Sequence, residues 1–434
     1  MRTSVTMLAL TAGIWLPVSV SSAQRPAGSS PAGDTLFLTR RQAILRALRT
    51  NPQVDIAREI ALQARAQRVQ ATAIDDPVFS ASADSLNSIR WIGSAPARPI
   101  ALSGGIPFPD KLRLRGKIGT AGVDVANASL TRLQQQLAAD AGRLYDSVLV
   151  VHLQQRTLLD SRELSVEFLK RTQARFNAGT VAKLDVIKAQ VDLAQAENDL
   201  IASRRDVANA DAALNRAIGR TTGTALVATD SLGVPGGLPS LDAIEASALS
   251  SRPELLAIEA QQRGARATSR LVRENAFLPD LKLGAGRDLA VPSGITYSVG
   301  FLVPIPLLFW QHARGDFAES HHRELELAAT LRDARAAVAQ DVRTTYATAE
   351  AALRQVMFLR DQLLPSAREA YRISTVSYGL GGLSALEVLD ARRQLLLAQS
   401  QYADALAAAN STRSDLERAA GAALSTLPDG ANRE

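Results

Sequence analysis

Hydrophobic residues recur along this chain with two different periods, which predict long helices and short strands. The clearest pattern steps by three and four residues over 186–217 and again over 388–419. A sustained 3–4 step is typical of a helix with a coiled-coil seam, and the many alanines in it predict close helix packing. Long helical patterns also precede these two segments, at roughly 112–175 and 313–377.

Between the helical regions the hydrophobic period changes to two, which predicts strands. Alternating apolar residues follow a proline in both places: Phe79, Ala81 and Ala83 after Pro77, and Leu281, Leu283 and Ala285 after Pro279. A second strand pattern follows each, and both end in a Pro-x-Pro step. We therefore expect β-hairpins at about 77–109 and 279–306. Each strand should span about ten residues, the length of a tilted transmembrane strand.

The same order of elements occurs twice. The segment RFNAGTVAKLDVIKAQ at 175–190 aligns with SYGLGGLSALEVLDAR at 377–392, so that Gly179 and Gly381 correspond, 202 residues apart. A pattern written twice indicates two copies of one structural unit. We predict repeats over 24–225 and 226–434, each containing a helix, a β-hairpin and a long helical hairpin with its tip near Gly179 or Gly381.

Proline and glycine mark where the predicted helices begin and end. Pro52 and Pro253 lie at corresponding places in the first helix of each repeat, and each helix should restart there because proline is tolerated only in a first turn. Glycine tolerates the backbone that ends a helix, which suits Gly179 and Gly381 to the turns between long helices.

Composition excludes several kinds of site. The 434 residues include no cysteine, so the chain has neither disulfides nor thiolate metal ligands. Aromatic residues make up 4%, a composition that suits long helices with thin cores better than a compact enzyme. The net charge of +6 is spread among interspersed acids and bases, so we expect no nucleic-acid partner.

The N-terminus is typical of an export signal. Arg2 precedes an apolar segment at 5–20, and Ser21-Ser22-Ala23 supplies small residues before a cleavage point at Gln24. We predict a signal peptide over 1–23, with an uncleaved membrane anchor as the alternative. No other stretch approaches the ~20 apolar residues that a spanning helix needs.

Four predicted strands per chain are too few to close a barrel. An open sheet edge cannot face lipid, because its backbone groups would find no hydrogen-bonding partner there. Three chains would supply twelve strands, an even number found in outer-membrane barrels. The predicted fold is therefore mainly α with a small transmembrane β part: a trimeric α-barrel of helical hairpins capped by a 12-stranded β-barrel.

Several motifs resemble the TolC-like outer-membrane efflux channel family over nearly the whole mature length. They are the two tip segments, the P-x-L-x-L strand start at 279–283 and the internal repeat. The resemblance implies a homotrimer in the outer membrane that extends into the periplasm. It also implies docking to a periplasmic adaptor protein and, through it, to an inner-membrane pump.

A finer resemblance concerns GGIPFPDKLRLRGKIGTA at 104–121. Its proline-containing, basic exit from the second strand is similar to that of the heavy-metal efflux subgroup, of the cobalt-zinc-cadmium and copper-silver kind. This implies heavy-metal cations as cargo, although the pump partners would set specificity.

Two acidic residues are candidates for a selectivity site. Glu387 and Asp390 are three residues apart near the start of a predicted helix, so they share a face. In a trimer each would form a ring of three carboxylates, which attracts cations to a pore. The resemblance places such residues at the periplasmic entrance. The alternative is that these acids only complement the helix dipole, and Asp185 fits that alternative better.

The resemblance also implies a gate at the entrance. Tyr378 matches an aromatic that bridges neighbouring helices and holds the entrance shut. The alternative is that Tyr378 is an aromatic at a helix end that only fills the seam between helices. Leu383 occupies a position where some members carry an arginine partner, so we expect closure here to depend on packing rather than on a charged latch.

Small residues at the two tips are candidates for adaptor contact, because they allow another helical hairpin to approach closely. They are Gly179, Thr180, Val181 and Ala182 at the first tip, and Gly381, Gly382, Leu383 and Ser384 at the second. In the clearest strand pattern, Tyr297, Val299 and Phe301 share one face and are predicted to contact outer-membrane lipid.

No catalytic triad, phosphate loop or cofactor motif stands out, so we predict neither enzyme activity nor a cofactor. His321 and His322 lack the spacing of metal ligands and are expected to be solvated surface. The alternatives to an efflux channel are the outer-membrane duct of a type I protein secretion system, a periplasmic adaptor, and an inert coiled-coil spacer. The repeat disfavours the adaptor, which would have a single hairpin.

Overall fold

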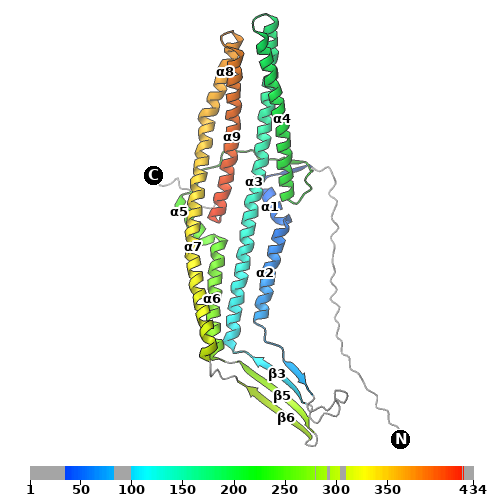
Figure 1. Cartoon of the computed structure of the whole chain (residues 1–434), viewed down its shortest axis with the longest axis vertical. Coiled ribbons are helices and arrows are strands. Elements are labelled where there is room, and N and C mark those ends of the chain that lie inside the picture. The colour runs from blue at the N-terminus through cyan, green and yellow to red at the C-terminus, as the bar shows by residue number, and fades with distance from the viewer. Residues whose placement is uncertain are drawn as a thin grey trace, which may run out of the picture. The chain divides into compact units, whose positions relative to one another are not determined.

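Long helices dominate the structure, a computed structural model of the chain (Figure 1). It describes residues 35–82, 99–278, 280–290, 294–303, 309–422 and 424. The predicted signal peptide, Ala83, Pro279 and the second Pro-x-Pro step at 304–306 lie outside the described residues.

The first repeat contains seven elements in the described residues. They are β1 (Leu36–Leu38), α1 (Arg40–Thr50), α2 (Pro52–Ala71), β2 (Val78–Ala81), β3 (Ile100–Ile106), α3 (Pro109–Asn177) and α4 (Lys183–Ala217). The break between α1 and α2 occurs at Asn51, whose side chain accepts a hydrogen bond from the N–H of Gln53 and so caps the helix that begins at Pro52.

The second repeat follows the same order. Its elements are β4 (Leu226–Ala228), α5 (Leu241–Ser251), α6 (Pro253–Phe277), β5 (Leu281–Ala290), β6 (Gly294–Leu302), α7 (Phe309–Phe358), a π-helical turn η2 (Leu359–Leu363), α8 (Leu364–Gly379) and α9 (Ala385–Ala420). The helix expected over 313–377 is thus interrupted by η2. Pro365, at the start of α8, has no N–H to donate to the preceding turn, and the wider turn accommodates it.

Four strands form one antiparallel sheet in the order β2-β3-β5-β6. Strands β5 and β6 have the predicted length, whereas the described parts of β2 and β3 are shorter than the ten residues expected. A second, parallel pair joins β1 to β4, with Leu36 opposite Leu226. This pair was not predicted, because three-residue strands are too short to show alternation.

The helices lie side by side along one direction, and α3 is covered by neighbours on both sides. Helix α3 packs against α2 and α6 in the half nearer the sheet, and against α4 and α9 in the half nearer the tips (Figure 1). Helix α7 packs against α6 and α9, and α8 packs against α9. Among the described elements, α4 and α8 therefore lie at opposite edges of the tip half.

The cores between these helices are thin. One cluster surrounds Val342, Leu255 and Leu416, and another surrounds Tyr145 and Leu214. Many of the remaining buried residues are alanines, such as those of the seam along α4 and α9. No helix in the described part of the chain is long and apolar enough to cross a membrane.

The chain reverses direction at two glycines with left-handed backbone. Gly179 has a φ of 74° and Gly381 a φ of 82°, conformations that residues with a Cβ rarely adopt. Because each glycine follows the end of a long helix, α3 and α4 form one helical hairpin, and α8 and α9 form the other.

Candidate functional site

The tip of the second hairpin is built around a capping box. The N–H of Ser384 donates to Glu387 at 2.7 Å, and the N–H of Glu387 donates to the Ser384 hydroxyl oxygen at 3.4 Å. The bonds that Glu387 accepts from the backbone and side chain of Ser384 hold the pKa of its carboxyl below the ordinary value. Glu387 therefore both starts α9 and carries a negative charge at neutral pH.

Glu387 and Asp390 line the same groove, which has a volume of about 1170 Å³ and lies between α4 and α9. The other charged residues along it are Asp192, Asp199, Lys188, Arg392 and Arg393. The structure thus brings the two predicted acids together. Asp185 is in the first turn of α4 and is not among the residues that line this groove.

A buried arginine beside this groove joins three helices. Arg392 of α9 is 9% exposed and pairs with Asp192 of α4. Its guanidinium also donates to the hydroxyls of Ser161 and Ser165 on α3. The Nε of Arg392 and one carboxylate oxygen of Asp192 have no partner among the described residues. This network could not be predicted from the sequence, because nothing in the local sequence marks an arginine as buried.

Tyr378 joins the two hairpins of one chain. Its side chain is 4% exposed and packs against Phe168 of α3, with the ring centroids 5.5 Å apart. The Arg175 guanidinium lies 4.5 Å from the centroid of the Tyr378 ring and also donates to the Tyr378 carbonyl. The hydroxyl of Tyr378 donates to Thr172 at 3.3 Å.

Arg175 changes the expectation of a gate held by packing alone. Leu383 is half-buried and lines the groove beside Glu387, where it supplies no charge. The cation against Tyr378 comes instead from the first hairpin, through a cation–π contact. Arg175 begins the quoted tip segment, but the repeat alignment alone did not show that it faces Tyr378.

The tip residues predicted for partner contact are largely accessible. Gly179, Thr180, Ala182, Gly381, Gly382 and Ser384 are exposed, whereas Val181 and Leu383 are half-buried. The most exposed apolar side chain at either tip is Leu380, at 85%, which the prediction omitted. An apolar side chain so exposed beside small residues is suited to contact with another protein.

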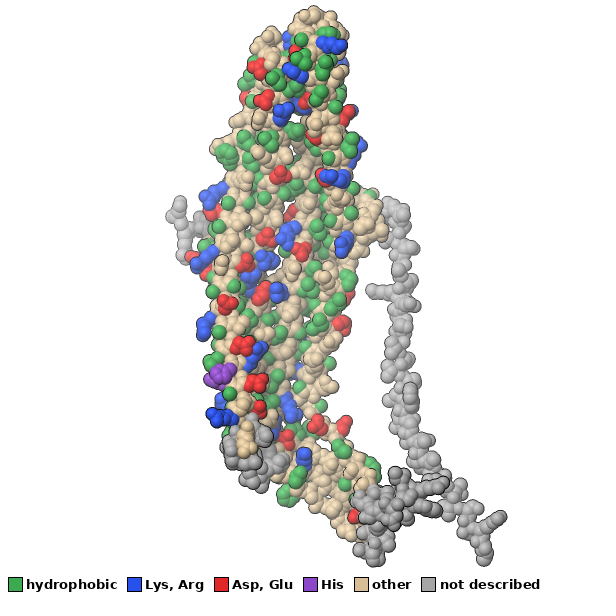
Figure 2. Space-filling model, viewed as in Figure 1, with side chains coloured by type: hydrophobic (Ala, Val, Ile, Leu, Met, Phe, Trp, Pro, Cys, Tyr) green, Lys and Arg blue, Asp and Glu red, His purple; other side chains and the backbone are tan. Residues whose placement is uncertain are grey.

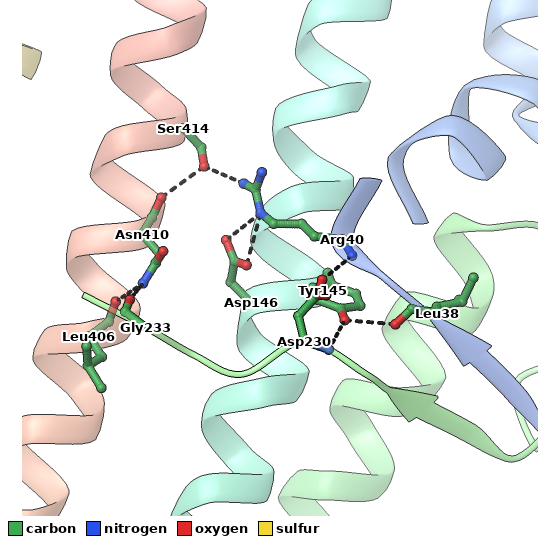
Figure 3. Close-up of polar contacts among 9 residues, drawn as sticks. All are labelled: Leu38, Arg40, Tyr145, Asp146, Asp230, Gly233, Leu406, Asn410 and Ser414. Atoms are coloured by element: carbon green, nitrogen blue, oxygen red, sulfur yellow. Dashed lines mark hydrogen bonds and ion pairs between the residues drawn. The ribbon is translucent and has the colours of Figure 1, made fainter. Parts of the chain in front are cut away.

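A second polar cluster lies midway along the helices and joins both repeats (Figure 3). Arg40 of α1 donates to Asp146 of α3 and to the hydroxyl of Ser414 on α9. Its backbone N–H donates to Asp230, whose own N–H donates to the Tyr145 hydroxyl. Burial raises the pKa of Asp146, and the positive charge of Arg40 opposes that effect.

This cluster has a structural role. Asn410 of α9 donates to the carbonyl of Gly233, so the segment that follows Asp230 is held across α9 (Figure 3). Among the described residues, no buried side-chain polar atom of Arg40, Asp146 or Tyr145 lacks a hydrogen-bond partner. The cluster fastens the segment between the repeats to the helices.

Surface charge shows no region of one sign on the face drawn in Figure 2, where basic and acidic side chains alternate along the helices. His321 and His322 are adjacent and exposed on α7. Within the described residues, no group of three or more histidine, aspartate or glutamate side chains could hold a metal ion.

The predicted lipid-facing residues lie in β6. Tyr297, Val299 and Phe301 are 75%, 89% and 77% exposed, and they alternate with Thr296, Ser298 and Gly300. Three large apolar side chains exposed together on one sheet face are unusual for a protein surface in water. The arrangement therefore fits contact with an apolar surrounding.

Comparison with known families accounts for both repeats. Residues 43–220 and 246–422 each match the family described as outer membrane efflux protein. The two matched segments cover most of the chain and correspond to the two copies recognised in the sequence.

Individual proteins resemble the chain more distantly. The cobalt-zinc-cadmium resistance protein CzcC of Cupriavidus metallidurans is 22% identical over 307 residues, covering 69% of this chain and 71% of CzcC. Among solved structures, the outer membrane protein VceC of Vibrio cholerae has a TM-score of 0.72 at 17% identity, over 89% of this chain and 96% of VceC. CusC has a TM-score of 0.72 at 18% identity, over 89% and 94%. These two likenesses establish the fold.

Proposed function

Because this chain belongs to the outer membrane efflux protein family, we propose that three copies of it close into one channel. The chain is the outer membrane component of a tripartite efflux system and not an enzyme. The family match also excludes the periplasmic adaptor and the inert spacer as alternatives. The number of copies, their contacts and the cargo are the parts of this function that we propose.

The trimer is supported by a second stripe of apolar residues on each of the two helices at the edges of the tip half, α4 and α8. On α4, the buried residues Val186, Ala189, Ala196 and Leu200 face α3, whereas Leu184, Ile187, Val191 and Ile201 are exposed. At 3.6 residues per turn the exposed set lies nearly opposite the buried set. An isolated chain would leave this stripe in water.

Helix α8, at the other edge, has the same two-sided pattern. Leu364 and Tyr378 are buried on one side, while Ile373 and Val376 are exposed on nearly the opposite side. We infer that α4 of one copy packs against α8 of the next. Such a head-to-tail contact generates a ring if the rotation closes, and three copies would also join β6 to β2 into a twelve-stranded barrel.

In this assembly the sheet lies in the outer membrane, with Tyr297, Val299 and Phe301 toward lipid. The hairpins extend into the periplasm, where the exposed tips would meet an adaptor and, through it, an inner-membrane pump. Glu387 and Asp390 would repeat three times around the entrance, which favours the passage of cations.

Divalent heavy-metal cations are the cargo that we propose. The name of CzcC refers to cobalt, zinc and cadmium resistance, and the carboxylates of Glu387 and Asp390 suit a cationic cargo. Deletion of the gene from its source bacterium should lower tolerance to cobalt, zinc or cadmium salts and leave tolerance to organic dyes unchanged. Loss of dye tolerance with normal metal tolerance would contradict this choice of cargo.

Cysteine cross-linking tests the trimer directly, because the native chain contains no cysteine. Ile187 lies eight residues after Gly179, and Ile373 lies eight residues before Gly381, so the two should meet at one level between copies. Oxidation of the Ile187→Cys/Ile373→Cys variant should give covalent dimers and trimers.

The matched control is Lys188→Cys/Ile373→Cys, which turns one cysteine by about 100° around α4 and should cross-link poorly. Monomers alone from the first variant, or a ladder that continues beyond three copies, would contradict the closed trimer.

A further inference from the structure

One face of the four-stranded sheet is apolar except for a single charge. Residues paired across antiparallel strands share a face. Along β5 and β6 this face contains the pairs Leu283 with Phe301, Ala285 with Val299, and Arg287 with Tyr297. On β3, Ile100 lies opposite Arg287. Arg287 is the only charged residue on this face in the described part of the sheet.

The other face does not explain Arg287. It carries small and polar residues, among them Ser103, Gly284 and Ser298, together with the charged Lys282 and Asp288. Asp288 is next to Arg287 in sequence but pairs with Thr296, which places it on the opposite side. Arg287 is exposed and makes no hydrogen bond or ion pair with any described residue. Its guanidinium is thus not used by the part of the chain that the structure describes.

The position of Arg287 along the strand fits the boundary of a membrane. Its row, Ala81, Ile100, Arg287 and Tyr297, is the outermost row that crosses all four described strands. Leu281, six residues earlier, lies about 20 Å away along the strand. The helices attach at the Leu281 end (Figure 1), so the Arg287 row lies at the end away from the periplasm.

Tyr297 supports the same placement. Tyrosine is enriched where a barrel meets the lipid headgroups, because its ring is apolar and its hydroxyl is polar. A charged side chain is tolerated on a lipid-facing strand near that boundary and strongly disfavoured at the bilayer centre. Arg287 can extend its guanidinium toward the headgroups while its methylene groups remain among apolar neighbours.

We propose that Arg287 and Tyr297 form a binding site for the phosphate of an outer-leaflet lipid, specifically a lipid A phosphate. The guanidinium donates two parallel hydrogen bonds to phosphate oxygens, and the Tyr297 hydroxyl donates a third. A phosphate monoester carries nearly two negative charges at neutral pH, whereas the diester of a phospholipid carries one, so the monoester binds more strongly. The site rests on the proposed function, because it requires the sheet to lie in the outer membrane.

The test uses the full-length protein in nanodiscs of phosphatidylcholine that contain diphosphoryl lipid A. Native mass spectrometry counts the lipid A molecules retained by the native protein, Arg287→Gln and Arg287→Lys. We expect Arg287→Gln to retain lipid A about tenfold more weakly, and Arg287→Lys to fall between them, because lysine makes no bidentate contact. Lys282→Gln, on the same strand but the opposite face, should behave as the native protein does.

Two results would overturn the site while leaving the channel intact. In the first, inserted trimers of Arg287→Gln retain lipid A as the native protein does. In the second, Lys282→Gln loses as much lipid A as Arg287→Gln does. Phosphatidylglycerol added as competitor should displace lipid A poorly, and equal displacement would contradict the assignment to a monoester. A native protein that does not insert into nanodiscs would overturn both the site and the proposed function.

Discussion

The two helical hairpins come from one repeated pattern, yet their tips differ. In the first hairpin α3 is unbroken from Pro109 to Asn177, and Ala182 gives α4 no side-chain cap. In the second hairpin a π-helical turn at Leu359–Leu363 interrupts the long helix, and Ser384 and Glu387 cap α9. The two copies have therefore divided their roles: the first is a continuous support, and the second carries the capped, acidic tip.

The contacts between the hairpins show the same division. Arg392 and Tyr378 belong to the second hairpin, and both reach partners on the first. Asp192 pairs with Arg392, while Phe168 packs against Tyr378. The second tip is thus held in place by the first, and loss of these contacts should free it.

The largest effect is expected for Arg392→Gln, which leaves Asp192 without its buried partner. Breaking a buried ion pair in this way destabilises a protein by about 3–5 kcal/mol. Thermal denaturation of the detergent-solubilised protein should therefore occur at a clearly lower temperature.

Arg393→Gln is the matched control for that variant, because Arg393 is exposed on the same helix. Addition of Asp192→Asn to Arg392→Gln should recover part of the lost thermal stability. Equal melting temperatures for Arg392→Gln and Arg393→Gln would show that the pair does not support the second hairpin.

The next largest effect should come from Tyr378→Ala. This change removes the packing on Phe168 and the cation–π contact with Arg175, so the open probability in planar lipid bilayers should rise about tenfold. Tyr378→Phe keeps the ring and should change the open probability little. If both variants open as rarely as the native channel, Tyr378 does not restrain the tip.

A smaller effect is expected for Glu387→Gln. Glutamine preserves the capping box but removes the charge, so the ratio of cation to anion permeability should fall about two- to threefold with the fold intact. Asp185→Asn, at the corresponding position of the first hairpin, should leave the ratio unchanged. Reversal potentials in a salt gradient measure this ratio for both variants. If the two variants lowered the ratio equally, the two tips would not differ in their effect on selectivity.

The smallest effect concerns pH. The pKa of Glu387 is lowered in the folded protein by the bonds from Ser384. The stabilisation from its ionised form is therefore complete above the ordinary glutamate value of about 4.3 and is lost as the pH falls through the lower, folded value. Cation selectivity should stay constant from pH 8 to about pH 5. A decline already near pH 6 would mean that the capping box does not hold the charge.

The repeated helices and the main sheet could be predicted because their signals are local. The 3–4 step predicts helices of the length seen, and the alternation from Ile295 to Phe301 predicts β6. Strands β1 and β4 are too short to produce a period, so only the folded chain reveals that they pair. The π-helical turn also escaped prediction, although Pro365 marks its position.

The site was predictable only in part, for the same reason. Glu387 and Asp390 share one helix face, so their spacing alone brings them together. Arg392 and Asp192 are 200 residues apart in sequence, and Arg175 and the Tyr378 carbonyl are 203 apart. Contacts of this kind depend on how the two hairpins pack, and a single sequence carries no signal for them.

We propose that the second tips form a cation-selective entrance at one end of a channel. Single-channel recording of the native protein in planar lipid bilayers tests it most directly, with a divalent cation titrated separately on the tip side and on the sheet side. We predict cation-selective openings that are blocked at lower concentrations from the tip side. Openings that lack cation selectivity, or that are blocked equally from both sides, would contradict a cation-selective entrance at the second tips.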